Sequence, residues 1–265
     1  MRHWNGIVRT ITSAGRAVLA GGLDLLLPNV CGGCDSRATP RGQLCDACTV
    51  RLLSLIALPY CPRCGATLGP NVPAYPDGCR ACPSPLPRFA RVFRLGPYAP
   101  PLNLVIRRFK FHHRLGLAEK LCTMLAERIG AEDDGDLPPD VIVPVPTYWM
   151  RRFSRSLDHA GLLAEHLARA LDLPIGAELL RVRNTPQQAH LSRTQRQASV
   201  KGAFRAIQAS ALGGARVLLV DDVTTTGATA NECARVLLAA GATRVNLAVL
   251  AKSEPPTAYS QHWET

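Results

Sequence analysis

The sequence lacks several features that define common classes of protein. No apolar run approaches the ~20 residues needed to span a bilayer. Three arginines, Arg2, Arg9 and Arg16, interrupt the first thirty residues, where no small-residue cleavage site is found either. We therefore expect a cytoplasmic chain without a membrane span. No Gly-Lys-Ser/Thr loop is present, and no Gly-x-Gly-x-x-Gly opens a helix, which argues against two common nucleotide-phosphate loops.

The composition is that of a folded protein with an anionic partner. Hydrophobic residues make up 47% of the 265 residues, enough for a core of ordinary size and too many for wholesale disorder. The formal net charge of +11 exceeds what solubility requires. This excess indicates a phosphorylated substrate, a nucleic acid, or both.

Eight of the ten cysteines form four Cys-x-x-Cys pairs. The pairs are Cys31/Cys34, Cys45/Cys48, Cys61/Cys64 and Cys79/Cys82. Two intervening residues let both thiolates of a tight turn reach one tetrahedral metal, so the pattern predicts two structural four-cysteine zinc sites. Sequential pairing is the simplest arrangement, and an interleaved cross-brace stays open. Disulfides would require an oxidising compartment, for which the sequence gives no sign. The remaining two cysteines, Cys122 and Cys233, are predicted to be buried in helices.

A second motif lies in the C-terminal half, where a short apolar run ends in two carboxylates. Residues 217–220 predict a buried strand that delivers Asp221 and Asp222 to its carboxyl end. A helix is expected over 230–240, stopping at Gly241. The loop between them offers backbone N–H groups and hydroxyls beside the positive end of the helix dipole, which suits a phosphate. Its residues are Thr224, Thr225, Thr226, Gly227, Ala228 and Thr229.

Carboxylates beside a phosphate loop suit hydroxyls that donate hydrogen bonds, so the motif predicts a site for a phosphorylated ribose. The alternative is an ordinary capped strand-to-helix turn, in which threonine at the helix N-terminus is common. Around this motif, apolar patterns alternate between strand and helix. Strands are expected over 141–146, 179–183, 203–207 and 245–250, and helices over 103–111, 117–129 and 157–171. This alternation predicts an α/β fold with a parallel sheet, whose ligands lie at the carboxyl ends of the strands.

Residues 217–229 resemble the PRPP-binding signature of the type I phosphoribosyltransferase family. The resemblance implies that Asp221 and Asp222 hold the ribose hydroxyls and that loop 224–229 holds the 5-phosphate, with Mg2+ bound alongside PRPP. Together with the cysteine pairs, residues 144–146 and 183–193 resemble the ComF family. This family combines a double zinc ribbon with a phosphoribosyltransferase-like domain and is associated with DNA uptake in natural competence. DNA-uptake or recombination proteins are therefore implied as partners.

The same patterns divide the chain into five parts. We expect a helical N-terminal segment over 1–27, a double zinc ribbon over 28–85, a helical connector over 86–137, a phosphoribosyltransferase-like domain over 138–252 and a C-terminal tail over 253–265. Proline clusters near residues 85 and 138 mark the two inner boundaries.

Basic residues outside the loop are candidates for contacts with pyrophosphate, the leaving group of a phosphoribosyl transfer. They are Lys110, Arg151, Arg152, Arg155, Arg193 and Arg196. The alternative function is a catalytically inactive protein that binds single-stranded DNA, because basic residues alternate with aromatic ones over 107–114 and 149–153. A further alternative makes the zinc module a docking surface for other proteins.

Overall fold

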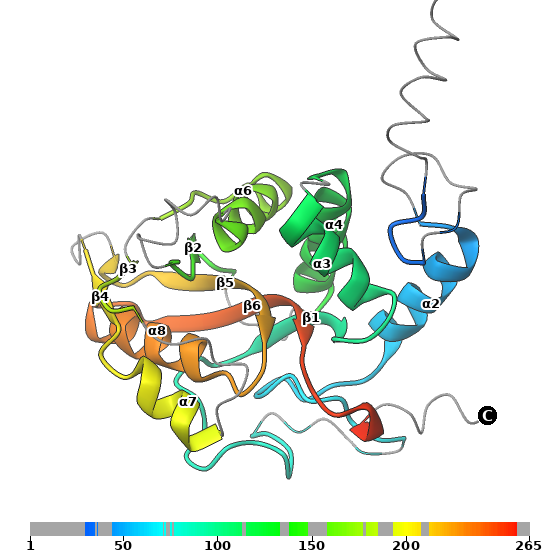
Figure 1. Ribbon diagram of the computed structural model, residues 1–265. Coiled ribbons are helices and arrows are strands. Elements are labelled where there is room, and N and C mark those ends of the chain that lie inside the picture. The colour runs from blue at the N-terminus through cyan, green and yellow to red at the C-terminus, as the bar shows by residue number, and fades with distance from the viewer. Residues whose placement is uncertain are drawn as a thin grey trace, which may run out of the picture.

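A four-stranded parallel sheet forms the centre of the fold (Figure 1). The computed structural model describes residues 30–34, 36, 44–70, 72, 75, 77–112, 115–132, 138–147, 158–176, 179–184, 193–207 and 212–258. In spatial order the strands are β1 (Val92–Pro97), β6 (Arg244–Lys252), β5 (Arg216–Thr224) and β2 (Val141–Pro144). All three strand pairs are parallel, so the carboxyl ends of the strands lie at one edge of the sheet.

Helices cover both faces of this sheet (Figure 1). One face packs against α3 (Leu102–His112), α4 (Leu115–Ala131) and α6 (His159–Leu171). The other packs against α7 (Arg193–Val200), α8 (Ala228–Ala239) and the antiparallel pair β3 (Leu179–Arg181) and β4 (Phe204–Ala206). Because both faces are covered, most residues of these strands are apolar and buried, as is usual for parallel strands.

The cysteine-rich region joins this core. Its helix α2 (Asp46–Ala57) buries Leu52 and Leu55 in the same apolar cluster as Phe93 of β1 and Leu125 of α4. A short 3₁₀ helix, η3 (Pro256–Ala258), follows the sheet. Within the described ranges, no helix combines the length and apolar character needed to cross a membrane.

The α/β fold with a parallel sheet is confirmed, and the strands and helices expected between residues 103 and 250 are present, whereas the N-terminal segment expected to be helical, 1–27, lies outside the described residues. Three elements were missed: β1, α2 and α7. Of these, β1 matters most, because it lies within the stretch expected to be a helical connector and pairs with β6 along the edge of the sheet.

Candidate functional site

The acidic pair lies inside β5, because this strand continues four residues beyond the expected end at Val220. Pairing with β6 persists to Thr224, which faces Lys252 in the register. Side chains of successive strand residues point to opposite faces. Asp221 and Asp222 therefore point to opposite faces at this edge of the sheet.

Asp222 faces α3 and forms an ion pair with Lys110. The distance between Lys110 Nζ and Asp222 Oδ2 is 2.5 Å, and the two side chains are 26% and 16% exposed, respectively. A ligand can therefore reach both groups from solvent. A lysine ammonium has three donors, so Lys110 can bind an anionic oxygen while it contacts the carboxylate.

Asp221 lies on the side of α8, in a recess of about 40 Å³ under the loop. Burial, together with the negative charge of Asp222, raises the pKa of Asp221 to about 7. Its Oδ1 accepts a hydrogen bond of 2.9 Å from the Asp222 backbone N–H. This carboxyl therefore holds its proton more tightly than an ordinary aspartate, which weakens its repulsion of an anion that binds nearby.

The loop after β5 turns directly into α8 through Gly227. This residue has a φ of 76°, in the left-handed region that glycine adopts without strain. The first N–H groups of a helix lack partners within the helix and carry its positive dipole end. One of them, Ala228 N–H, contacts Thr226 Oγ1 at 3.4 Å. Thr224 is buried, whereas Thr225, Thr226 and Thr229 remain partly exposed beside the helix N-terminus.

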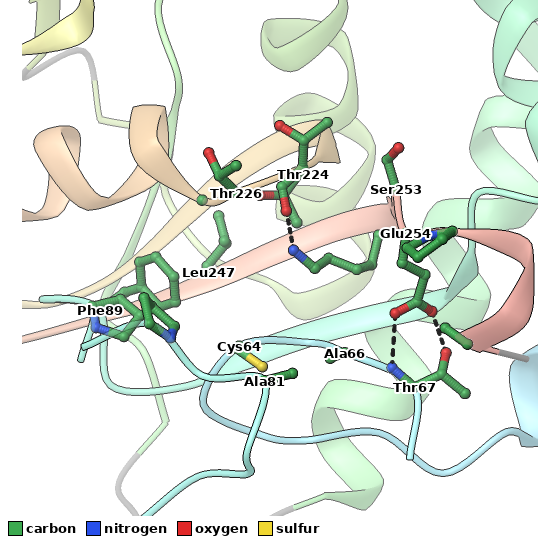
Figure 2. A pocket seen from close by; sticks show the side chains of 17 residues that line it. Cys64, Ala66, Thr67, Ala81, Phe89, Thr224, Thr226, Leu247, Ser253 and Glu254 are labelled. Carbon is green, nitrogen blue, oxygen red and sulfur yellow. Dashed lines mark hydrogen bonds between the residues drawn. The ribbon is translucent and has the colours of Figure 1, made fainter. Parts of the chain in front are cut away.

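A second, larger cavity of about 310 Å³ opens on the other side of the loop (Figure 2). Residues 224–227 form one wall, and Leu247 and Phe89 contribute apolar surface. Cys64 and Ala81 of the cysteine-rich region line the opposite side. The loop after β5 and the cysteine-rich region therefore line the same cavity from two sides.

Three residues at the end of β6 were missed by the sequence analysis, Lys252, Ser253 and Glu254, and all three line this larger cavity. The Lys252 ammonium donates to the Thr225 carbonyl, and the Ser253 N–H donates to the Thr224 carbonyl at 2.8 Å. Their place in the sequence, directly after a predicted strand, could have indicated that they lie near the site. They follow a predicted parallel strand at the edge of the sheet where ligands gather.

Of the six basic residues predicted to contact pyrophosphate, Lys110 is the one whose side chain the structure describes. Arg151, Arg152 and Arg155 lie outside the described residues. Arg193 and Arg196 belong to α7, and their side chains also fall outside the description. Their expected contacts stay predictions.

The eight paired cysteines form two clusters, with sequential pairing. The first cluster contains Cys31, Cys34, Cys45 and Cys48, and the second contains Cys61, Cys64, Cys79 and Cys82. In each cluster the four sulfur atoms lie within 4.8 Å of one another. Sulfur–sulfur distances of 3.6 Å in the first and 3.7 Å in the second are close to the roughly 3.8 Å edge of a tetrahedron with Zn–S bonds of 2.3 Å. Both donor sets fit zinc, and the cross-brace alternative does not apply.

The thiols of the second cluster interact strongly. Hydrogen bonding from Cys64 is the main influence that lowers the pKa of the Cys61 thiol, to about 5. The same interaction raises the pKa of the Cys64 thiol, so Cys61 loses its proton before Cys64. By contrast, Cys122 and Cys233 are buried outside the clusters, as predicted.

Two models of known protein families match parts of this chain. Residues 157–263 match the phosphoribosyl transferase domain, and residues 22–83 match the double zinc ribbon domain. The chain is 33% identical to competence protein F of Haemophilus influenzae over 217 residues, which cover 80% of this chain and 92% of that protein. It is 32% identical to DNA utilization protein YhgH of Salmonella typhi over 234 residues, which cover 86% of this chain and 99% of that protein.

Among solved structures, the glutamine phosphoribosylpyrophosphate amidotransferase from B. subtilis aligns with 50% of this chain and 25% of its own length. The identity is 25% and the TM-score is 0.34, too low to bear on function.

Proposed function

We propose that this chain, which belongs to the ComF family, acts in DNA uptake through a site for PRPP or a related phosphorylated ribose. Its similarity to competence protein F and to DNA utilization protein YhgH extends over most of its length. Two four-cysteine zinc ribbons accompany this site. We also propose a cytoplasmic location, because metal-binding thiolates persist in a reducing compartment.

The observation that carries the proposal is the turn from β5 into α8. It supports binding of a 5-phosphate, because the N-terminus of a 12-residue helix and several loop threonines line the recess of about 40 Å³ at this turn. Asp222 is accessible for the ribose hydroxyls, and Lys110 beside it supplies a cation for pyrophosphate oxygens. If Mg2+ binds with PRPP, the Asp222 carboxylate offers the kind of oxygen ligand that it prefers, and the ion would neutralise negative charge on pyrophosphate.

In such a site a transfer reaction requires no protein nucleophile. An acceptor attacks the anomeric carbon, the bond from that carbon to a pyrophosphate oxygen breaks, and the bonding electrons leave with pyrophosphate. The chain's contribution is to hold the ribose by the loop and Asp222, and to stabilise the negative charge on the leaving group. Lys110 is positioned for the second role.

Calorimetric titration of the zinc-loaded chain with PRPP, with and without Mg2+, tests the proposal. We expect Mg2+-dependent binding that weakens about tenfold or more in Thr226→Ala and Asp222→Asn, since each loses a hydrogen bond with a charged partner. Thr243→Ala is the matched control: its hydroxyl donates to the Gly214 carbonyl at 3.0 Å, before β6 begins. Absence of PRPP binding by the wild-type chain, or equal weakening in the control, would contradict the assignment. Incubation of the same chain with PRPP and a panel of acceptors tests transfer.

Binding of single-stranded DNA is the second candidate function, favoured by the charge of +11 and by the DNA-related names of the relatives. The basic stretch of α3 supports it only weakly. Phe109 is 1% exposed and belongs to the core, so it cannot stack on a base. Arg108 donates to the Cys31 carbonyl, whereas Arg107 is exposed. Fluorescence anisotropy with a labelled oligonucleotide should show affinity that falls steeply with salt, and a flat salt response would exclude the electrostatic mode.

A further inference from the structure

The second cysteine cluster is joined to the phosphate loop by two separate chains of contacts. We propose that metal in this cluster controls the loop, with Glu254 as a positioning residue, so that loss of the metal loosens the loop and weakens ligand binding. The ligand part of this proposal rests on the proposed function, whereas the coupling of cluster and loop does not depend on it.

The first route begins in the hairpin that carries Cys61 and Cys64 at its tip. Tyr60 and Thr67 pair across this hairpin, and both the backbone N–H and the hydroxyl of Thr67 donate to the Glu254 carboxylate. Figure 2 shows these two bonds. Opposite them, Arg94 of β1 forms an ion pair with Glu254 at 3.1 Å.

This contact is buried, which makes it rigid. The side chains of Arg94 and Glu254 are 0% and 7% exposed, respectively. Arg94 also donates to Thr67 Oγ1 at 2.7 Å. A buried charge that loses its partner is costly, so each member fixes the others in place. The position of the hairpin therefore sets the position of Glu254.

From Glu254 the route continues along the chain to the loop. Its neighbour Ser253 donates its backbone N–H to the Thr224 carbonyl at 2.8 Å, and the Lys252 ammonium donates to the Thr225 carbonyl. Thr224 and Thr225 are the residues from which the loop departs. The end of β6 thus holds the loop at its base.

The second route starts inside the cluster, at Arg63 between Cys61 and Cys64. Its guanidinium donates to the carbonyls of Pro87 at 3.3 Å and Phe89 at 3.1 Å, and to the Ala90 carbonyl. These residues form the connector that leads into β1. The ring of Phe89, only 2% exposed, lies against Gly227, where an added Cβ would be 3.4 Å from its Cζ. The same metal site therefore supports the loop at its base and at the start of α8.

The first cluster has different neighbours, which provides an internal control. The Arg108 guanidinium of α3 donates a hydrogen bond to the Cys31 backbone carbonyl. Gly32 lies against Leu117 of α4, and Gly33 lies against Pro101 before α3. The contacts of this cluster lead to the α3 and α4 face of the sheet. Because α3 also carries Lys110, which pairs with Asp222, loss of metal there should act on Asp222 rather than on Ser253 and the base of the loop.

Hydrogen–deuterium exchange on the full-length chain measures the coupling without any ligand. Cys79→Ser weakens the second cluster, and Cys34→Ser weakens the first. We expect faster exchange of the Ser253 amide and of residues 225–229 in Cys79→Ser, and no change there in Cys34→Ser. Zinc content measured by mass spectrometry verifies that each variant loses one ion.

Three further variants test the route while leaving the metal ligands intact. Thr67→Val keeps the shape and the backbone N–H but removes the hydroxyl, and Thr67→Ser restores it. Coupling residues of this kind change affinity roughly 2- to 30-fold. We expect PRPP binding in Thr67→Val to weaken within that range, and Thr67→Ser to behave as wild type. Glu254→Gln, which leaves Arg94 without a counter-ion, should have a larger effect if it folds.

The outcomes separate this proposal from the proposed function. Equal exchange at Ser253 and the loop in both cysteine variants would overturn the coupling, whether or not PRPP binds. Faster exchange in Cys79→Ser together with no PRPP binding by wild type would keep the coupling and reject the ligand. Weaker binding in Thr67→Val that Thr67→Ser does not restore would also count against Thr67 as part of the route.

Discussion

Replacing Asp221 with asparagine should stabilise the ligand-free chain at pH 8 and have little effect near pH 4. The residue lies in the recess under the phosphate loop, where burial and the charge of Asp222 raise its pKa from 3.8 to about 7. Asparagine has nearly the same shape and carries no charge. The variant therefore isolates the cost of ionising this one group.

The sign and size follow from proton linkage. A carboxyl whose pKa is higher in the folded than in the unfolded chain binds its proton more tightly when folded. Stability therefore falls as the pH rises between the two values, here from about 4 to about 7, and stays low above that window. At about 1.4 kcal/mol for each pH unit, an interval of roughly three units corresponds to about 4 kcal/mol. For a chain of this size that is on the order of 10 °C in Tm.

Differential scanning calorimetry of the zinc-loaded chain at pH 4.5 and pH 8 gives the difference in Tm between Asp221→Asn and wild type. All other titrating groups are shared, so the change of this difference with pH belongs to Asp221. Asp140 supplies a control of opposite sign, because hydrogen bonds from Arg216 lower the pKa of Asp140 to about 2. Asp140→Asn should be less stable than wild type by a similar amount at pH 5 and pH 8. The Asp140 carboxylate stabilises the fold at both pH values, and this stabilisation is lost only as the pH falls through the pKa of Asp140 in the folded chain. A difference for Asp221→Asn that is the same at both pH values, or a lower Tm at pH 8, would refute the reasoning.

Three shorter predictions concern the backbone, the buried ion pair and the metal sites. Gly227→Ala should cost about 1–2 kcal/mol in urea denaturation, because its φ of 76° is unfavourable for a residue with a Cβ; an unchanged midpoint would show that the turn relaxes. Arg94→Met should cost about 3–5 kcal/mol by leaving the Glu254 carboxylate buried without a counter-ion, whereas Arg88→Met, at an exposed position, should be nearly neutral. The wild-type chain should carry two zinc ions by native mass spectrometry and Cys34→Ser one, and zinc should be released as the pH falls and thiolates take up protons. A single ion in wild type, or loss of both in the variant, would contradict two independent sites.

The parts of the fold that local patterns control were predictable from the sequence. The apolar run of β5 and the helical spacing of α8 predicted both elements and the loop between them. The Cys-x-x-Cys spacing predicted both clusters, since two residues between ligands leave little choice of geometry. The direction of the two carboxylates was not predictable in this way. It depends on how far β5 continues, and pairing with β6 extends it to Thr224.

The missed parts depend on residues far apart in the chain. β1 contains Arg94, and a charged residue in a short apolar run obscures a buried strand. Its partner Glu254 lies 160 residues later, in a stretch with no motif. Lys252 was overlooked for the same reason: its place beside Thr224 and Thr225 exists only once β6 pairs with β5. Sequence periodicity reports which residues are buried, and it does not report which buried charges meet.

The boundary proposed at residue 85 separates segments of different composition, whereas the packing crosses it. Leu52 and Leu55 of α2 share an apolar cluster with β1, α3 and α4. Across the same boundary, the Val92 N–H donates to the Pro62 carbonyl at 2.7 Å. The free energy of metal binding in a four-cysteine site is available for folding. Because β1 and the cysteine-rich region share these contacts, zinc stabilises an edge of the sheet as well as its own turns. The loop at the carboxyl edge of that sheet is therefore supported by the second cysteine cluster, through the contacts of Thr67 with Glu254 and of Phe89 with Gly227.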